Sequence, residues 1–275
     1  MEIKTVALFF NSKRETCSKA AKDLKTSLEK EQIKTKILPY DNLKINQNFD
    51  LIFSLGGDGS LLKIVRKTAH RKIKILGLNF GHLGFLTYDK QNNIKELLKS
   101  LKTDKFCLQK RALIEVQVIR NKKNVFKGIA LNECTIKSNK TRAIHLNTFY
   151  EKSELKEYFA DGIMLCTPTG STAYNLAAGG PILEPSLEAF ILTPICPHTL
   201  AQRPLVLKLN SPLFINGQDE AHLCLDGQIF FKLSKKDKVQ IKRSPLNAKI
   251  IFAKDYDFFK LLTQRLTWGG NCKNA

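Results

Sequence analysis

No run of apolar residues in this 275-residue chain approaches the roughly 18 residues that a membrane-spanning helix needs. The apolar run at residues 6–10 is also too short for the core of a signal peptide, and we interpret it as a first strand. Internal repeats and low-complexity segments are missing as well. These absences argue against a helical membrane protein and a repeat protein, and we expect a cytoplasmic location with no membrane partner.

The chain also lacks the cysteine and histidine patterns of metal sites and disulfide frameworks. Its seven cysteines are scattered and odd in number, and no two of them have C-x-x-C spacing. The five histidines form neither an H-x-x-x-H nor an H-E-x-x-H pattern. We therefore expect reduced, mostly packed thiols and no metal site built from protein side chains.

The formal net charge of +20 is not arranged as it is in nucleic-acid-binding proteins. Lysine and arginine are spread along the chain, without a basic arm and without the interleaved aromatic residues of RNA-binding motifs. Most of these charges are expected on solvated faces, although a positive field also attracts polyphosphate ligands. We expect no nucleic-acid partner, and a basic nucleic-acid-binding protein stays as the non-enzyme alternative.

Strands and helices alternate in the N-terminal part of the chain. Strands are predicted at residues 4–10, 33–38, 51–55 and 73–78, and helices at residues 12–30 (with Ser12 as N-cap), after the turn at residues 56–60, and at residues 93–101. This order predicts βαβ units and a parallel, Rossmann-like sheet. Ligands of such sheets bind beyond the carboxyl ends of the strands, where residues 56–60 and 77–84 fall.

A glycine turn, Gly56-Gly57-Asp58-Gly59-Ser60, connects one buried strand to its helix. Glycines let a ligand approach the backbone closely, and the start of a helix presents unpaired N–H groups to an anion. A carboxylate in such a turn is suited to phosphoryl transfer. The alternative is a tight turn in which Asp58 caps the helix, and the turn alone leaves both interpretations open.

The pattern changes after residue 102 to short, alternating segments. Strands are predicted at residues 112–120, 125–136, 145–150, 163–166, 205–207, 222–225, 229–233 and 238–241. They predict a mostly antiparallel β domain, and we place the boundary between residues 104 and 105. An amphipathic pattern at residues 258–268 predicts a final helix that packs onto an apolar surface.

Two polar segments interrupt the apolar stretches of the second domain. Asn132 and Glu133 can pair with an adenine edge and with ribose hydroxyls, or they are solvated residues of a hairpin. Farther on, a strand runs into residues 167–172 and a short helix that Gly179 and the following residues end. The hydroxyls and N–H groups at this helix start suit a sugar, a base or a phosphate, unless Ser171 or Thr172 simply caps the helix.

Neither the lysine of a P-loop nor the protein-kinase motifs are present. Taken in order along the chain, the segments above resemble the NAD kinase family, whose members phosphorylate the adenosine 2′-hydroxyl of NAD to make NADP. The glycine turn alone is shared with phosphofructokinases and lipid kinases, whereas the ordered set is specific. The matching segments are residues 56–60, 77–86, 132–133, 161–162, 167–174, 179–183, 197–200, 203–206 and 226–228.

The resemblance implies an α/β domain at residues 1–104, a β-rich dinucleotide-binding domain at residues 105–254, and a final helix at residues 255–270 that returns to the first domain. It implies that Asp58 is the catalytic base, accepting the proton of the ribose 2′-hydroxyl as this oxygen attacks the γ-phosphorus. ATP (or polyphosphate) and NAD are the implied substrates, with Mg²⁺ bound through the nucleotide phosphates. The implied assembly is a homo-oligomer, either a dimer or a tetramer.

The resemblance also implies a set of nucleotide-binding residues. Asn132 and Glu133 match the motif that binds the adenosine half, Asp161 matches an aspartate near the nicotinamide ribose, and Lys63 matches a position that is often basic. The full set is Gly59, Lys63, Asn132, Glu133, Asp161, Thr172, Ala173, Tyr174, Asn175, Leu176, Ala177 and Gln228.

Two departures from the family pattern concern affinity or donor choice. Phe159 stands where some relatives carry arginine, two residues before Asp161, and residues 138–143 lack the usual turn chemistry. The competing enzyme hypothesis is another kinase with the same glycine turn that acts on a lipid or a sugar phosphate. The segment at residues 167–174 argues against it, because it supplies part of a dinucleotide site.

Overall fold

The computed structural model describes residues 3–266, apart from residues 39, 42, 44, 82–83, 89–96, 98, 102, 104, 152 and 209. The chain divides into two compact units, one made of Met1–Gln109 with Lys249–Ala275 and the other of Lys110–Ala248. The long strands β6 (Phe106–Arg120) and β16 (Lys238–Ala253) contribute residues to both units.

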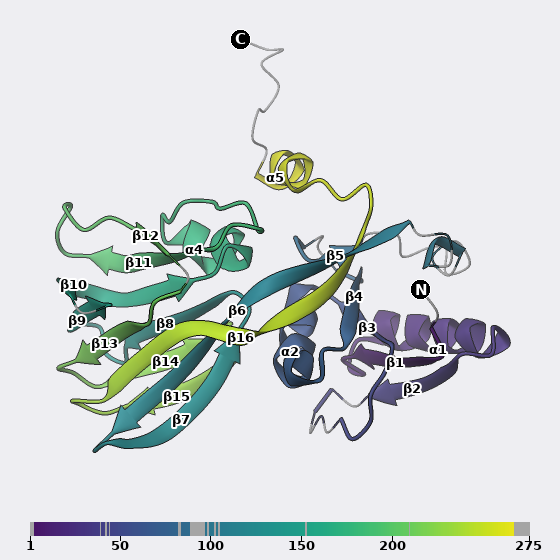
Figure 1. Ribbon diagram of the computed structural model, residues 1–275, viewed down its shortest axis with the longest axis horizontal. Coiled ribbons are helices and arrows are strands. Elements are labelled where there is room, and N and C mark those ends of the chain that lie inside the picture. The colour runs from purple at the N-terminus through teal and green to yellow at the C-terminus, as the bar shows by residue number, and fades with distance from the viewer. Residues whose placement is uncertain are drawn as a thin grey trace, which may run out of the picture. The chain divides into compact units, whose positions relative to one another are not determined.

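Parallel strands form the sheet of the first unit (Figure 1). Its order is β2 (Lys34–Leu38), β1 (Thr5–Phe10), β3 (Leu51–Gly56) and β4 (Lys74–Asn79), and β4 also pairs with β5 (Thr87–Tyr88) and with the end of β16. α1 (Glu15–Lys30) and α2 (Asp58–Thr68) pack on these strands, and the short turn Ala69–Arg71 follows α2. β3 is buried along its whole length, as expected for a central parallel strand. The predicted parallel α/β domain is confirmed.

The start of α1 differs from the prediction. Cys17, Ala21, Leu24 and Leu28 are buried at helical spacing, as the sequence pattern indicated. The helix begins at Glu15, however, and Ser12 does not cap it. Asn11 forms a turn there instead, because its side-chain oxygen accepts the Lys13 N–H at 3.0 Å and its carbonyl accepts the Arg14 N–H at 3.0 Å.

Antiparallel strands form the second unit (Figure 1). Its main path is β15 (Ile229–Leu233), β14 (Ala221–Leu225), β8 (Glu133–Ser138), β10 (Ser153–Cys166), β9 (Ile144–Tyr150), β13 (Leu213–Gly217) and β16. β11 (Ala189–Pro197) pairs with β10 and with β12 (Leu205–Lys208), and β7 (Lys123–Ala130) pairs with β6. The predicted antiparallel β domain is confirmed, and its strands contribute a buried core of mainly aliphatic residues.

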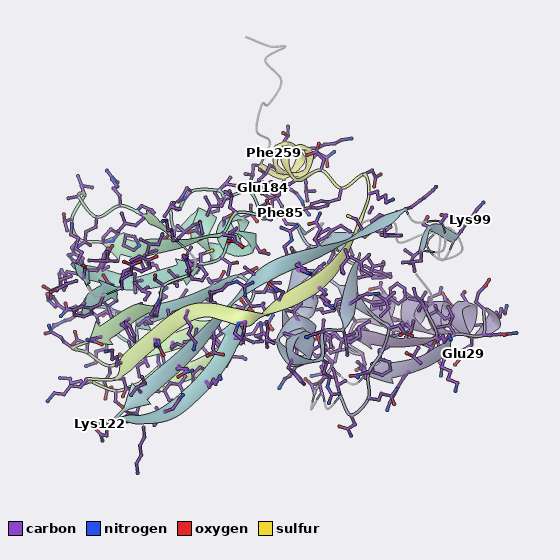
Figure 2. The ribbon with its side chains drawn as sticks, in the orientation of Figure 1. Glu29, Phe85, Lys99, Lys122, Glu184 and Phe259 are labelled. Atoms are coloured by element: carbon purple, nitrogen blue, oxygen red, sulfur yellow. The ribbon has the colours of Figure 1, made fainter. Side chains whose placement is uncertain are left out.

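Two hairpin turns of this unit use backbone conformations with positive φ at both central residues. Asn121 and Lys122 have φ of 49° and 61° at the tip of the β6–β7 hairpin, where Lys122 extends from the end of the strands in Figure 2. Asp226 and Gly227 have φ of 49° and 64° between β14 and β15. Such turns match the right-handed twist of the strands that they join.

The cysteines are free in the part of the chain that the structure describes. Cys17, Cys134 and Cys166 are buried, and burial raises the pKa of the Cys134 and Cys166 thiols well above the usual value. Cys196 is exposed. Within the same described residues, none of the helices has the length and apolar character needed to cross a bilayer.

Candidate active site

Asp58 occupies the first position of α2, directly after β3 and Gly57. Its carboxylate does not cap the helix. Oδ2 accepts the Phe85 N–H at 2.8 Å, and Oδ1 accepts the Leu86 N–H at 3.2 Å and the Thr87 hydroxyl at 3.3 Å. The interpretation of the glycine turn as a capped turn is therefore wrong, because the carboxylate is bound by a segment beyond the neighbouring strand β4.

The environment of Asp58 favours the protonated form of its carboxyl group. Burial raises the pKa of Asp58, and the hydrogen bonds from Phe85, Leu86 and Thr87 and the charge of Arg265 oppose this shift without cancelling it. A carboxylate offers about four lone-pair positions, and the bonds above use two on Oδ1 and one on Oδ2. Among the described residues, no further donor contacts Oδ2, so this oxygen has a second acceptor position open.

Gly84 allows this arrangement because it has no side chain. A Cβ atom at Gly84 would overlap all three atoms of the Asp58 carboxylate group. At Gly81, in the same segment, a Cβ would meet only Arg14 Nη1, at an ordinary 3.8 Å. The sequence motif at residues 77–86 thus contains one glycine that the Asp58 carboxylate requires and another that it does not.

Gly84→Ala is expected to lower kcat by about 100-fold, because small displacements of a reacting group have effects of this size. Gly81→Ala is the matched control and is expected to keep nearly all activity. Steady-state kinetics of the two variants beside the wild type makes the comparison. Equal kcat values for Gly84→Ala and Gly81→Ala would show that Asp58 does not need its observed position.

Residues near the C-terminus complete the surroundings of Asp58. The Tyr256 hydroxyl donates to the Phe85 carbonyl at 3.4 Å, and the rings of Phe85 and Phe258 lie 6.3 Å apart. Phe258 begins α5 (Phe258–Leu266), which belongs to the first unit as predicted for the final helix. Predicted helix residues beyond 266 lie outside the described part of the chain.

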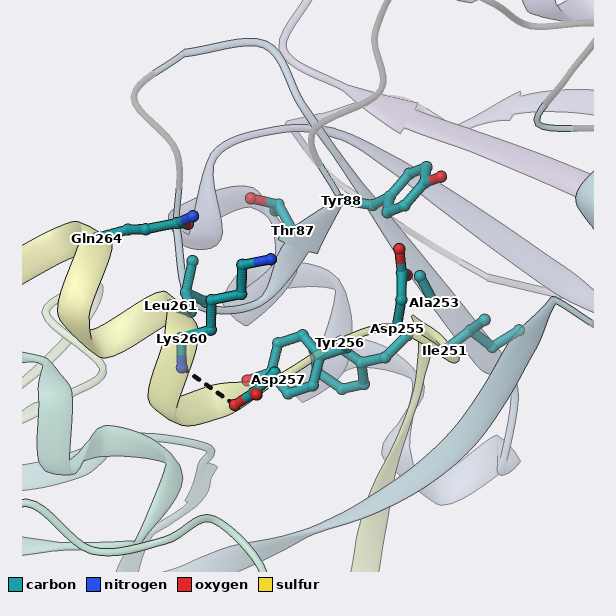
Figure 3. Close-up of a pocket in the computed structure, with 11 residues that line it drawn as sticks. Thr87, Tyr88, Ile251, Ala253, Asp255, Tyr256, Asp257, Lys260, Leu261 and Gln264 are labelled. Atoms are coloured by element: carbon teal, nitrogen blue, oxygen red, sulfur yellow. Dashed lines mark hydrogen bonds between the residues drawn. The ribbon is translucent and has the colours of Figure 1, made fainter.

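A cavity of about 360 Å³ lies between β5, the end of β16 and α5 (Figure 3). Thr87 lines it, and the hydroxyl of the same residue donates to Asp58. Lys260 and Gln264 line it from α5, whose first turn is fixed by Asp257 accepting the N–H groups of Phe259 and Lys260. The cavity therefore reaches a direct hydrogen-bond partner of the Asp58 carboxylate.

The other predicted binding residues of the first unit, Gly59 and Lys63, differ in their surroundings. Gly59 is exposed at the start of α2. The Lys63 ammonium lies 3.6 Å from the centre of the Tyr40 ring and 3.7 Å from Asp41 Oδ1, so a nearby carboxylate already balances its charge. Within the matched segment at residues 77–86, residues 82 and 83 lie outside the described part of the chain.

In the second unit, Asp226 fixes the backbone of the Asn132–Glu133 segment. The carboxylate of Asp226 accepts the N–H groups of Leu131, Asn132 and Glu133 at 3.1, 2.8 and 3.3 Å, and its own N–H donates to the Glu133 carbonyl at 3.0 Å. Asn132 and Glu133 are both buried, so they are not solvated hairpin residues. The Asn132 side-chain oxygen is buried without a hydrogen-bond partner among the described residues.

The segment that follows β10 packs against the backbone of residues 131–132. The Thr167 N–H donates to the Asn132 carbonyl at 2.8 Å, and the Thr167 hydroxyl donates to the Leu131 carbonyl at 2.5 Å. A Cβ at Gly170 would overlap the Asn132 backbone. The structure thus brings together three motifs that lie far apart in sequence, at residues 132–133, 167–170 and 226–228.

Ser171 and Thr172 do not cap the short helix α4 (Tyr174–Ala177), so that interpretation is wrong. The Ser171 hydroxyl donates to the Pro168 carbonyl at 2.7 Å and accepts the Leu183 N–H at 3.1 Å, which orders the turn Thr169–Thr172. Tyr174 is 37% exposed. Its hydroxyl accepts from the Lys137 ammonium at 3.2 Å.

The remaining predicted contacts differ in accessibility. Thr172, Ala173 and Leu176 are half-buried, whereas Ala177 and Gln228 are exposed. Asn175 is fully buried, because its amide donates to the Ser171 and Pro181 carbonyls and accepts the Thr193 hydroxyl. The geometry of Asn175 therefore supports the shape of the loop rather than contact with a ligand.

Asp161 lies on β10, away from the motifs at residues 132–133, 167–170 and 226–228. It is half-buried and precedes by five residues Cys166, which pairs with Glu133. At about 3.3 Å per residue, the separation along the strand is roughly 17 Å. Phe159, two residues before Asp161, packs between the rings of His145 and His198, with ring centroids 4.5 and 4.6 Å away.

Both units of the chain are similar to domains of known proteins. Residues 5–106 match the model of the ATP-NAD kinase N-terminal domain, and residues 131–253 match that of the ATP-NAD kinase C-terminal domain. The chain belongs to the NAD kinase family. An NAD kinase of Campylobacter jejuni (strain 81-176) is 37% identical over 221 residues, which cover 80% of this chain and 77% of that protein. An NAD kinase of Geobacter sulfurreducens is 38% identical over 224 residues, covering 80% and 79%.

Solved structures of other proteins have the same fold as this member of the NAD kinase family. The yeast NADH kinase in complex with NADH has a TM-score of 0.89 at 22% identity, covering 100% of this chain and 91% of that chain. The Archaeoglobus fulgidus NAD kinase in complex with ATP has a TM-score of 0.75 at 27% identity, covering 96% and 98%. The matches do not favour the alternative of a kinase for lipids or sugar phosphates.

Sequence reasoning did not single out several residues that contact the predicted ones within each unit. The roles of Gly84 and Asp226 emerged only from the structure, although both lie in matched motifs. Lys137 follows the strand predicted at residues 125–136, and Arg265 lies in the amphipathic pattern at residues 258–268, and nothing in those patterns distinguished them. Their importance depends on contacts between segments distant in sequence.

Proposed function

We propose that this phosphotransferase transfers the γ-phosphoryl group of ATP to the 2′-hydroxyl of the adenosine ribose of NAD. The observation that carries the proposal is the carboxylate of Asp58, which is oriented by Phe85, Leu86 and Thr87 rather than by its own helix and keeps a lone pair on Oδ2. Asp58 accepts the proton of the 2′-hydroxyl as this oxygen bonds to the γ-phosphorus. The bond from that phosphorus to the β,γ-bridging oxygen breaks, and ADP leaves.

The glycine turn before Asp58 supports a phosphate beside this base. Gly57 has φ of −93°, an ordinary backbone angle for any residue, and a Cβ there would meet no described atom within 4 Å. The fold itself therefore does not require glycine at this position. Close approach of a ligand to the N–H groups at the start of α2 gives a reason for it.

The second unit supplies the groups that recognise the acceptor. Among the described residues, the Asn132 side-chain oxygen has no hydrogen-bond partner, and the Glu133 carboxylate is buried. Both suit the donor groups of adenine and ribose, and both depend on Asp226 for their position. Tyr174 exposes an aromatic ring beside Lys137. Asp161, roughly 17 Å along β10, suits the nicotinamide half of an extended dinucleotide.

Mg²⁺ enters this proposal with the triphosphate, as part of the substrate. Within the described residues, no three histidine, cysteine, aspartate or glutamate side chains come together as a metal site. The phosphate oxygens of ATP are hard ligands that Mg²⁺ prefers. When bound there, the ion neutralises charge on the β- and γ-phosphates, and the residues of the chain orient the acceptor and remove its proton.

A panel of acceptors tests the proposed function against its enzyme alternative. The purified chain is supplied with MgATP and, in separate reactions, NAD, NADH, diacylglycerol or fructose 6-phosphate, and ADP release is followed. A parallel NAD reaction with polyphosphate tests the donor. We expect kcat/KM to be highest with a nicotinamide dinucleotide, whereas preference for the lipid or the sugar phosphate would overturn the proposal.

The pH dependence of kcat/KM follows from the state of Asp58. Burial raises the pKa of this carboxyl group above the ordinary aspartate value, and only the ionised form accepts a proton. Activity is therefore expected to fall with decreasing pH at a higher pH than an exposed aspartate would give. In the protein without substrate, the raised pKa means that protonation of Asp58 stabilises the folded state relative to the unfolded state. This contribution to the free energy of unfolding is present at low pH and is lost as the pH rises through the raised pKa. A pH–rate profile without an acidic limb above the usual aspartate range would contradict this assignment.

A further inference from the structure

Two side-chain nitrogens of Arg265 have no hydrogen-bond partner in the part of the chain that the structure describes. Arg265 lies in the last turn of α5, and its Nε and Nη2 atoms are buried with no hydrogen-bond partner among the described residues. These two nitrogens lie on one edge of the planar guanidinium, the edge that binds a carboxylate or a phosphate through two parallel hydrogen bonds. Buried, unsatisfied donors on a charged group are destabilising, so a ligand that completes them would remove this cost.

The charge of Arg265 acts on Asp58. It lowers the pKa of the Asp58 carboxyl group, in opposition to the larger effect of burial. Among the described residues, however, no hydrogen bond or ion pair joins the Arg265 and Asp58 side chains. Asp58 accepts hydrogen bonds from Phe85, Leu86 and Thr87 instead. Arg265 is thus close enough to influence the proposed base without being neutralised by it.

Other features around Asp58 favour a negatively charged ligand. The first N–H groups of α2 begin at Asp58, where the helix has the positive end of its dipole. The open space at Gly57 lets an anion approach this backbone. The segment that orients Asp58 also contacts the C-terminal region through Tyr256 and Phe258, which ties the position of α5 to that of the carboxylate.

We infer that Arg265 is a catalytic residue that binds the transferred phosphoryl group through Nε and Nη2. The inference rests on the proposed function and adds a residue to it. Arg265 takes no proton and forms no covalent bond in the reaction. It stabilises the charge on the phosphoryl oxygens while the bond to ADP breaks and the proton of the acceptor hydroxyl moves to Asp58.

Two substitutions test this role against a structural one. Arg265→Gln removes the charge and the paired donors, and Arg265→Lys keeps the charge but loses the planar edge. The matched control is Lys67→Gln, which removes one positive charge from the exposed last turn of α2. We expect kcat to fall about 10²–10³-fold in Arg265→Gln, as when a transition-state donor is removed. Arg265→Lys should recover part of this loss, and the KM for NAD should stay near the wild-type value in all three variants.

A binding measurement separates this inference from the proposed function. Inorganic tripolyphosphate is titrated calorimetrically into the full wild-type chain and each variant, without any acceptor. Loss of binding in Arg265→Gln, with retention in Lys67→Gln, supports the anion site even if the wild type makes no NADP. Wild-type kcat and wild-type tripolyphosphate affinity in Arg265→Gln would overturn the inference while leaving the NAD kinase proposal intact. Equal losses in Arg265→Gln and Lys67→Gln would also overturn it, because they would reflect net charge alone.

Discussion

Asp58→Asn is expected to lower kcat for NADP formation by about 10²–10⁴-fold, the range that a positioned general base contributes. Asparagine has nearly the same shape as aspartate but cannot take a proton from the ribose hydroxyl. Its side-chain oxygen can still accept one of the hydrogen bonds that Phe85 and Leu86 donate to Asp58. Steady-state kinetics with saturating MgATP measures the loss, and NAD binding by calorimetry is expected to stay close to the wild-type affinity.

The matched control for Asp58→Asn is Asp23→Asn, which makes the same chemical change on the exposed face of α1. This control is expected to keep wild-type kcat. The pH profile adds a second criterion, because the acidic limb assigned to Asp58 should disappear from the residual activity of Asp58→Asn. Full activity of Asp58→Asn would remove Asp58 from the chemical step.

Asp226→Ala is expected to have the second large effect, through the Asn132–Glu133 segment. The substitution leaves three buried N–H groups without the acceptor that they have in the structure. Unsatisfied buried groups cost about 1–3 kcal/mol each, so a total loss of at least about 3 kcal/mol is expected. At about 2–4 °C per kcal/mol, Tm should fall by roughly 6–12 °C. The KM for NAD should rise, because Asn132 and Glu133 lose their fixed backbone.

Asp226→Asn serves as the graded comparison for Asp226→Ala. It keeps one side-chain oxygen as acceptor, and asparagine tolerates the positive φ of 49° at this turn position. Its Tm and its KM for NAD are expected between those of the wild type and Asp226→Ala. If Asp226→Ala keeps both wild-type values, Asp226 does not position the acceptor site.

Much of the fold could be predicted from the sequence, and the exceptions have identifiable physical causes. Buried parallel strands such as β3 are short apolar runs, so the sequence pattern was enough to predict them. β10 was predicted only at residues 163–166, because its first half pairs with β9 through exposed, charged residues such as Glu154 and Lys156. β11 was missed although it is buried, since Pro194 and Pro197 disfavour a strand.

The candidate site was less predictable than the fold, because its geometry comes from contacts that are distant in sequence. Asp58 was identifiable from its glycine turn, but the turn alone was equally compatible with a helix cap. Only the bonds from Phe85, Leu86 and Thr87 exclude that reading. Asn175 belonged to the nucleotide-binding set that the resemblance implied, and it is nevertheless buried in its own loop.

The most direct test is the formation of NADP itself. Purified wild-type chain is incubated with MgATP and NAD, and the product is measured with an NADP-specific dehydrogenase, beside Asp58→Asn and a reaction without enzyme. We predict that the wild type makes NADP, with one ADP released per NADP, and that Asp58→Asn makes at least about 100-fold less. A folded wild-type chain that binds NAD but yields no NADP from ATP or polyphosphate would contradict the proposed function.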